Sequence, residues 1–215
     1  MTQLVYTVCS ISQIPFALAL GEDLQKHEPN TKFVIGLADR LPSDLPAIAF
    51  PIVAADELGL PFLSEMGNRY TIDELTRSLK PYFASFLEKK YQANKIIFLE
   101  SQTQLFQSLA QTWQILDEYN IVLSPNITQQ RNPSHPINEP SFLNAGLYNA
   151  GFWGYKPSTQ AESFLTYWKE RTKEKGYFDF CHGFGAEQLW LNFIPIFQEN
   201  VYIQSEIGLH YHPYN

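Results

Sequence analysis

The chain has few cysteines and no long basic or apolar run. Cys9 and Cys181 are its two cysteines in 215 residues, too few for a disulfide framework and typical of a reducing compartment. The net charge is −7 and no Lys/Arg-rich run is present, which excludes a nucleic-acid partner. No apolar run approaches the roughly 20 residues that cross a bilayer, and no basic-then-apolar leader is visible. We therefore expect one cytoplasmic domain without a transmembrane segment.

A glycine-rich phosphate loop is also missing. The first expected strand, residues 4–8, is followed by residues 9–13 (Cys-Ser-Ile-Ser-Gln), which contain neither glycine nor charge. This disfavours a Rossmann dinucleotide site, and also a nucleotidyltransferase with a glycine-rich basic loop at this point. The helix expected from Pro15 to Lys26 still offers free N–H groups to an anion at its N-terminus.

Short apolar runs alternate with helical patterns along the whole chain. The expected strands are residues 4–8, 32–37, 51–53, 95–99, 121–123, 148–155 and 201–203. The expected helices are residues 15–26, 71–79, 105–116 and 159–175, with helical spacing that resumes after Pro81 and a last helix that has Pro195 near its end. Capping boxes at residues 71–74 and 159–162 mark two of the helix starts. The alternation predicts an α/β fold.

The strand at residues 95–99 is the one around which the site is expected. A short apolar run between polar residues is typical of a buried parallel strand, and ligands collect beyond the carboxyl ends of such strands. The residues that follow it are Glu100, Ser101 and Gln102. Any chemistry is therefore expected near Glu100 and Gln102.

Two further charged residues have open interpretations. Asp39 ends the second strand, where a carboxylate can reach a ribose hydroxyl or can simply be solvated. Lys80 precedes Pro81, which is expected to kink or break the helix. Lys80 is either a solvated surface residue or, if it points inward, a phosphate clamp.

The C-terminal half contains a long loop and a glycine-punctuated strand. Residues 124–141 form a proline-, asparagine- and serine-rich segment that is either functional or disordered. In the strand that follows, Gly151 allows close approach of a ligand. Asn149 can bind sugar hydroxyls or satisfy nearby backbone groups. Trp153 and Tyr155 can stack on a sugar or pack in the core.

With these elements in place, the order of motifs resembles that of GT-A-type nucleotide-sugar glycosyltransferases over nearly the whole chain. The match lies in residues 7–12, the stretch from Tyr70 to Pro81, the strand before Glu100, residues 124–128, residues 142–151 and residues 187–190.

The resemblance implies a single GT-A-like, Rossmann-like domain over residues 1–215 with a mixed, mostly parallel sheet flanked by helices. Residues 1–123 are expected to hold the nucleotide and residues 124–215 the acceptor. The implied function is transfer of a sugar, a hexose or a related one, from a nucleotide-diphosphate-sugar donor to a saccharide or other hydroxyl acceptor. The implied substrate-binding residues are Thr7, Ser10, Asp39, Tyr70, Lys80, Asn149 and Gly151.

The chain departs from the resembled enzymes at their metal motif. There the strand end carries Asp-x-Asp, which holds Mg²⁺ or Mn²⁺ against the diphosphate. Here the matching residues are Glu100 and Gln102, so one of two carboxylates becomes a neutral amide. Either metal binding is weakened, or the diphosphate charge is neutralised by other groups, namely Lys80, helix N-terminal amides and His210 or His212.

The histidines also raise the question of zinc. His210 and His212 would share one face of a strand, and Cys181 with His182 could add ligands. The spacing matches none of the usual zinc patterns, and terminal histidines are usually exposed.

Glu187 and Gln188 are the candidate catalytic residues. Glu187 lies at an expected helix start, where its carboxylate could activate an acceptor hydroxyl or simply stabilise the helix dipole. Gln188 would hydrogen-bond the sugar or the acceptor. The altered metal motif leaves a second hypothesis open, a catalytically silent nucleotide- or sugar-binding protein on the same fold.

Overall fold

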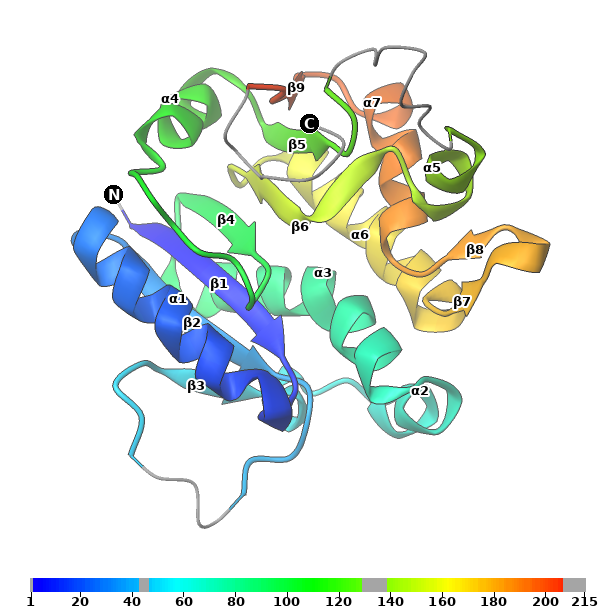
Figure 1. Ribbon diagram of the computed structural model, residues 1–215, viewed down its shortest axis with the longest axis horizontal. Helices are drawn as coiled ribbons and strands as arrows, with labels where there is room; N and C mark the ends of the chain where they lie inside the picture. Colours follow the sequence, from blue (N-terminus) through cyan, green and yellow to red (C-terminus); the bar gives the residue numbers. More distant parts are fainter. Residues whose placement is uncertain (1, 43–46, 129–138, 207–215) are drawn as a thin grey trace, which may run out of the picture.

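The computed structural model describes residues 2–42, 47–128 and 139–206, which fold around a seven-stranded sheet (Figure 1). The strand order is β3-β2-β1-β4-β6-β5-β9. The strands are β1 (Gln3–Cys9), β2 (Lys32–Leu37), β3 (Ile52–Ala54), β4 (Lys95–Leu99), β5 (Ile121–Pro125), β6 (Tyr148–Tyr155) and β9 (Val201–Ile203). Among these strands, β6 is antiparallel to its neighbours β4 and β5, and the other neighbouring pairs are parallel. The prediction of a mixed, mostly parallel α/β sheet is confirmed.

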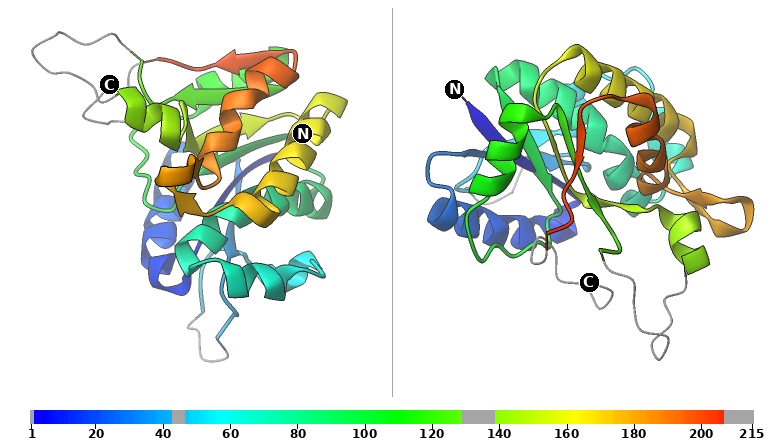
Figure 2. Two further views of the ribbon diagram at one scale, coloured as in Figure 1. Left: turned by 90° about the vertical axis from the view of Figure 1, so that its right-hand side faces the viewer. Right: turned by 90° about the horizontal axis from the view of Figure 1, so that it is seen from above.

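Helices cover both faces of this sheet (Figures 1 and 2). The four longest are α1 (Ile14–His27), α3 (Ile72–Tyr91), α4 (Ala110–Glu118) and α6 (Thr159–Lys175). Side chains alternate between the two faces of a strand, so Leu4 and Tyr6 of β1 pack with α3 and α6, whereas Val5 and Cys9 pack with α1 and α4. Two apolar layers, one on each side of the sheet, therefore hold the strand ends in place.

Shorter elements complete the described part of the chain. They are α2 (Leu63–Arg69), α5 (Glu139–Ala145), α7 (Ile194–Phe197), the 3-10 helices η1 (Ile11–Gln13), η2 (Ala55–Leu58), η3 (Phe180–His182) and η4 (Gln188–Phe193), and the two-residue strands β7 (Phe178–Asp179) and β8 (Phe184–Gly185). Strands β7 and β8 form a hairpin that projects at the right of Figure 1.

The start of α3 is as predicted, but its middle is not. The Thr71 hydroxyl accepts a hydrogen bond from the backbone N–H of Glu74, and the Glu74 carboxylate accepts one from the backbone N–H of Thr71, which completes the capping box. The expectation of a break at Pro81 is wrong, because α3 continues through it to Tyr91, while the alternative of a kink stays a prediction. Pro81 is buried, and packing of α3 on the sheet and α6 outweighs a cost of roughly 3 kcal/mol for an interior proline.

The predicted helix at residues 105–116 begins late, at Ala110. Two carboxylates, one in α1 and one directly after it, hold the preceding segment in another conformation. The Asp23 side chain accepts from the Leu105 backbone N–H at 3.0 Å, and the Glu28 side chain accepts from the Leu109 backbone N–H. These long-range hydrogen bonds override the local apolar pattern, so the segment that leaves β4 stays non-helical up to Leu109.

The last two helical predictions also need correction. Helix α6 is capped by Ser158, whose hydroxyl accepts from the Ala161 backbone N–H at 3.1 Å, rather than by Thr159. The last predicted helix is divided into η4 and α7. Pro195 lies in the first turn of α7, where its missing N–H costs nothing.

Candidate functional site

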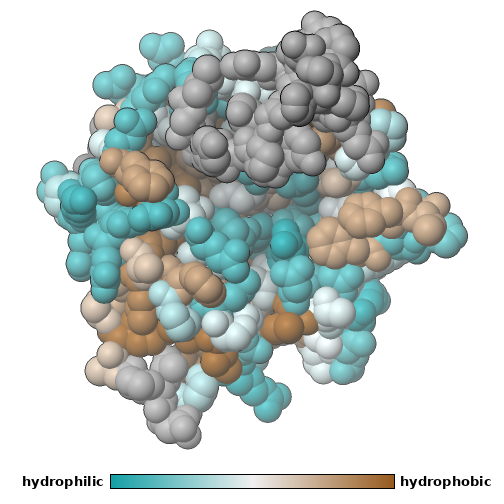
Figure 3. Space-filling view, viewed as in Figure 1, coloured by the Kyte–Doolittle hydropathy of each residue, from teal (hydrophilic) through white to brown (hydrophobic). Residues whose placement is uncertain are grey.

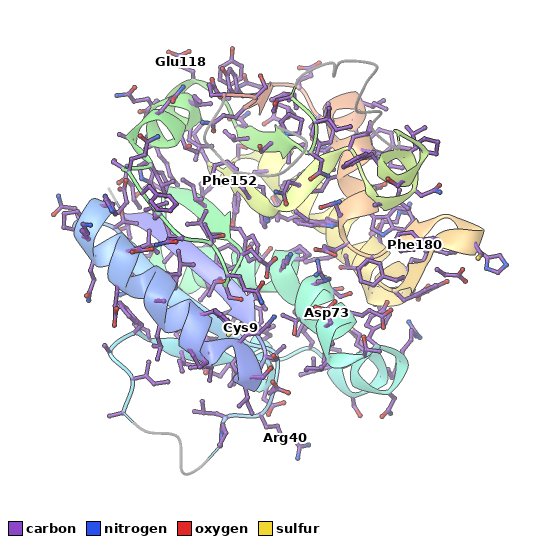
Figure 4. All side chains as sticks on the ribbon, viewed as in Figure 1. Cys9, Arg40, Asp73, Glu118, Phe152 and Phe180 are labelled. Carbon is purple, nitrogen blue, oxygen red and sulfur yellow. The ribbon has the colours of Figure 1, made fainter. Side chains whose placement is uncertain are left out.

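Polar side chains follow the carboxyl ends of β1, β2 and β4, which meet at one edge of the sheet because these strands are parallel neighbours. The Asp39 carboxylate, after β2, accepts a hydrogen bond from the Ile11 backbone N–H at 2.6 Å and so ties the loop after β1. Cys9 ends β1 beneath α1 (Figure 4). Burial, and then the nearby charges of Glu100 and Asp39, raise the pKa of the Cys9 thiol to about 12. The carboxylates of Asp39 and Glu100 therefore both lie close enough to the end of β1 to act on the Cys9 thiol.

Lys80 points from α3 toward Glu100, directly after the end of β4, and is completely buried, with 0% of its side chain exposed. Its Nζ donates to Glu100 Oε2 at 2.8 Å, to Glu187 Oε1 at 2.8 Å and to the Ala150 carbonyl at 3.2 Å. It also lies 4.8 Å from the centroid of the Phe98 ring. One ammonium group thus joins α3, the end of β4, β6 and the residue before η4. Lys80 therefore points inward, which is one of the two orientations that the sequence left open.

Arg77 extends the ion pairs along α3 to Asp73, and these two residues are the ones that sequence reasoning missed. Arg77 Nη1 lies 3.5 Å from Glu187 Oε1, and Arg77 Nε donates to Asp73 Oδ2 at 2.9 Å. Figure 4 shows Asp73 in the first turn of α3. The signal was present in the sequence, because Asp73, Arg77 and Lys80 are spaced four and three residues apart on one helix face. We call Asp73, Arg77, Lys80, Glu100 and Glu187 the Lys80 cluster.

The charges in the Lys80 cluster stabilise one another. Burial alone would raise the pKa of Glu187, but Lys80 and Arg77 outweigh it and hold that pKa below its ordinary value. Burial alone would lower the pKa of Lys80, but Glu100 and Glu187 outweigh it and raise that pKa. Burial would likewise lower the pKa of Arg77, and Glu187 with Asp73 raises it. The buried members are therefore ionised at neutral pH.

Glu187 is deeply placed for a residue expected to act on a hydroxyl. Its side chain is 1% exposed, its backbone carbonyl accepts from Trp168 Nε1 at 2.9 Å, and the preceding Ala186 has a φ of 51°. Its Oε2 is buried and has no hydrogen-bond partner among the described residues. The carboxylate thus balances Lys80 and Arg77 from within the protein.

Gln188 connects the Lys80 cluster to a cavity. Its Oε1 accepts from the Ala150 backbone N–H at 3.1 Å, and its Nε2 donates to the Ala145 carbonyl at 3.2 Å. The cavity, of about 500 Å³, is lined among the described residues by Asn126, Pro140, Ser141, Phe142, Asn144, Ala145, Phe180 and Gln188. We call it the Gln188 cavity.

Two predicted residues lie on β6 beside Glu100. Asn149 Oδ1 accepts from the Gly151 backbone N–H at 2.7 Å, which is the local backbone role that the sequence left open. The Gly151 carbonyl accepts from the Glu100 backbone N–H, and a Cβ on Gly151 would lie 2.9 Å from Asn149 Oδ1. The absence of a side chain at Gly151 therefore makes room for the Asn149 side chain next to Glu100.

Three other predicted residues are held by the fold. Thr7 is fully buried in β1, and its hydroxyl has no partner among the described residues. Ser10 Oγ is paired with Ser12 Oγ at 2.9 Å. The Tyr70 hydroxyl donates to the Thr172 carbonyl and accepts from the Gly176 backbone N–H, so it joins the turn between α2 and α3 to the end of α6 and not to the Lys80 cluster.

The aromatic side chains of β6 belong to the core. Trp153 and Tyr155 are fully buried, which decides for packing over sugar stacking. Trp153 stacks on Tyr155 with ring centroids 5.9 Å apart and contacts Trp168 edge-on at 5.0 Å.

The expected metal ligands are only partly within the described structure. Glu100 is 31% exposed and paired with Lys80, and Gln102 is exposed in the turn that follows. His210 and His212 lie outside the described residues. Cys181 and His182 are exposed, and His182 Nδ1 lies 2.7 Å from Asp179 Oδ2.

No group of three or more His, Cys, Asp or Glu side chains suited to a metal is found in residues 2–42, 47–128 and 139–206. Among those residues there is also no helix with the length and apolar character to cross a membrane.

Comparison with known proteins gives a structural answer. No protein-family model matches the chain, and no curated protein matches its sequence. Solved glycosyltransferases do match its structure. The glycosyltransferase GlyE of Streptococcus pneumoniae TIGR4 matches over 95% of this chain with a TM-score of 0.55 and 13% identity. The chain has the GT-A fold.

Two further structures agree with this assignment. The bifunctional glycosyltransferase WbbM matches over 94% of this chain, with a TM-score of 0.56 and 12% identity. A protein of Desulfovibrio desulfuricans G20 described as a nucleotide-diphospho-sugar transferase matches over 95%, with a TM-score of 0.50 and 8% identity. This chain covers 45% of GlyE, 38% of WbbM and 80% of the Desulfovibrio protein. It thus spans less than half of the first two, and at such identities the likeness establishes the fold alone.

Proposed function

We propose that the protein transfers a sugar from a nucleotide-diphosphate-sugar donor to a hydroxyl acceptor. The observation that carries the proposal is the position of Lys80. From α3 it binds Glu100 at the end of β4, in the expected nucleotide half, and Glu187 and the Ala150 carbonyl in the expected acceptor half. In open α/β folds ligands bind at this edge of the sheet. The Lys80 cluster thus fixes both halves of the proposed site at the place where donor and acceptor would meet.

Glycosyl transfer passes through an oxocarbenium-like transition state in which the leaving diphosphate gains charge. Arg77 is the cation of the cluster that a donor could reach, since 36% of its side chain is exposed while Lys80 is buried. The expected metal would be held by Glu100 and Gln102 and would neutralise the diphosphate. Mg²⁺ is often held by one or two carboxylates together with the phosphates of a substrate. One partly exposed carboxylate and one amide therefore fit a cation that arrives bound to phosphate better than they fit a cation bound by the protein alone.

A second candidate function is supported by the burial of Glu187. A carboxylate that is 1% exposed and paired with two cations is poorly placed to take a proton from an acceptor hydroxyl. Gln188 cannot act as a base, because an amide has no accessible protonation at neutral pH. The alternative is a catalytically silent protein that binds a nucleotide or a sugar on this fold.

Titration calorimetry with nucleoside diphosphates, with and without Mn²⁺, followed by a donor-hydrolysis assay, separates the two candidates. Binding with turnover supports the transferase, and binding without turnover supports the silent protein. If no nucleoside diphosphate binds under either condition, both nucleotide-dependent functions are refuted and only sugar binding remains. The Arg77→Gln variant should weaken nucleotide binding, because it removes the exposed cation and leaves Lys80 in place.

A further inference from the structure

The Gln188 cavity has the size of a small-molecule site. Its volume of about 500 Å³ lies within the range of roughly 300–1,000 Å³ that is usual for ligand pockets. It is bounded by the end of β5, by α5, by the hairpin β7–β8 and by the first residue of η4. These elements come from four separate stretches of the C-terminal half. The cavity is thus a feature of the tertiary fold and not of one loop.

The described part of the cavity lining carries no charged side chain. Among the described lining residues there is no Asp, Glu, Lys, Arg or His, whereas three are amides, one is a serine and two are phenylalanines. An amide both donates and accepts hydrogen bonds, as a sugar hydroxyl does. An aromatic ring covers the apolar face of a bound ligand. A charged ligand would lose its hydration here, and none of the described lining residues offers it an opposite charge in return.

Phe180 provides an exposed aromatic surface at this cavity. It is 53% exposed and lies on the hairpin next to Phe178, with ring centroids 5.7 Å apart. Figure 4 shows Phe180 on the hairpin side of the molecule, and Figure 3 shows apolar surface over the same region. An exposed ring beside a polar cavity is suited to stacking on a ligand that has one polar and one apolar face.

The cavity shares a wall with the Lys80 cluster. Gln188 follows Glu187 directly and binds the Ala150 backbone N–H, while the Ala150 carbonyl accepts from Lys80 Nζ. A hydroxyl bound at Gln188 would therefore lie next to the cluster edge at which the proposed donor binds.

We propose that the Gln188 cavity binds an uncharged saccharide, which is the acceptor of the proposed transfer. Binding by the amide and aromatic lining does not require the transferase activity, but the acceptor role rests on it. Uncharged sugars are preferred over uronic or sialic acids, because nothing in the described lining compensates a carboxylate.

The test is saturation-transfer NMR and titration calorimetry with methyl glucoside, methyl galactoside, N-acetylglucosamine and lactose, and with glucuronate as the charged probe. We expect binding of at least one neutral sugar and at least about tenfold weaker binding of glucuronate. Phe180→Ala and Asn144→Ala should each weaken the neutral sugar about three- to tenfold. Phe197→Ala is the matched control, since Phe197 is 54% exposed on α7 and does not line the cavity.

Three outcomes would overturn the inference. These are affinities weaker than about 10 mM for every neutral sugar, equal affinity for glucuronate, and equal effects of Phe180→Ala and Phe197→Ala. Thermal unfolding of each variant confirms that it is folded. Nucleotide binding without sugar binding would refute the inference and leave the proposed donor site intact. Sugar binding without nucleotide binding would keep the cavity and refute the acceptor role.

Discussion

Replacement of Lys80 by methionine is the sharpest perturbation that the structure offers. Methionine has nearly the length of the lysine side chain but removes the ammonium group. Glu187, which is 1% exposed, then keeps only Arg77 at 3.5 Å as a counter-ion, and Glu100 and the Ala150 carbonyl lose a donor. Removing one partner of a buried ion pair costs about 3–5 kcal/mol, because the other charge remains buried. We expect the free energy of unfolding of Lys80→Met to fall by that amount in urea denaturation.

The pH dependence identifies the cause. In the wild-type protein the folded-state pKa of Glu187 is lowered. Its stabilising contribution to the free energy of unfolding is therefore fully present above the unfolded pKa of about 4.3 and is lost as the pH falls through the folded-state pKa. Without Lys80, burial dominates and raises this pKa. The cost of Lys80→Met should then grow as the pH rises above about 4.3, by about 1.4 kcal/mol for each unit by which the pKa is raised.

Two variants complete this experiment. Adding Glu187→Gln to Lys80→Met removes the stranded charge and should recover at least about 1 kcal/mol. Lys90→Met is the matched control, because Lys90 is 38% exposed and its partner Glu57 is 46% exposed, so solvent screening limits that pair to at most about 1 kcal/mol. A loss in Lys80→Met no larger than in Lys90→Met, or the same loss at every pH, would refute the assignment of Lys80 as the charge that balances Glu187.

Three other variants or measurements test separate parts of the structure. Gln102→Asp should strengthen Mn²⁺-dependent nucleotide binding about tenfold, or 1.4 kcal/mol, in calorimetry, and an unchanged affinity would show that this strand end does not hold the metal. Glu28→Gln should lower the free energy of unfolding by about 2 kcal/mol, because the buried Glu28 carboxylate accepts hydrogen bonds from Ser108 Oγ, Trp113 Nε1 and the Leu109 N–H. A loss of stability smaller than that of the control variant Glu57→Gln would contradict this structural role of Glu28. At about pH 8 a thiol-reactive disulfide reagent should label the exposed Cys181 but not Cys9, whose pKa is raised to about 12, until denaturant is added; two thiols labelled in the native protein would be the opposite result.

Local sequence signals were sufficient for most of the sheet and for one helix start. Residues 4–8 and 95–99 are apolar and β-branched enough to be buried on both faces, which is why they form β1 and β4. Thr71 and Glu74 specify the start of α3 through hydrogen bonds to each other's backbone, so no distant residue is needed. Such signals succeed because all the groups that determine the structure lie within a few residues.

The errors have a common physical origin in distant partners. The start of α4 depends on Asp23 and Glu28, about eighty residues earlier in the chain. The partners of Lys80 lie 20 and 107 residues away, so its burial could not be decided from the residues around Pro81. Glu187 followed the helix-start pattern, yet its role is set by Lys80 and Arg77. Lys80, Glu100 and Glu187 could thus be singled out from the sequence, while Asp73, Arg77 and the contacts among all five could not.

The balance of charge in the Lys80 cluster bears on how a donor could bind. Asp73, Glu100 and Glu187 outnumber Arg77 and Lys80 by one, and Asp39 adds another negative charge at the same edge. A nucleoside diphosphate alone would thus meet a net negative surface among the described residues. A cation that arrives with the diphosphate reverses the sign of that interaction, because it is attracted to both the phosphates and Glu100. Because Gln102 replaces one Asp-x-Asp carboxylate, the attraction of the cation to this strand end is weaker. The repulsion of the nucleotide without a cation is weaker as well, so the two effects on nucleotide affinity oppose each other. Donor binding in this protein should therefore depend on divalent cations less steeply than it would with aspartate at position 102.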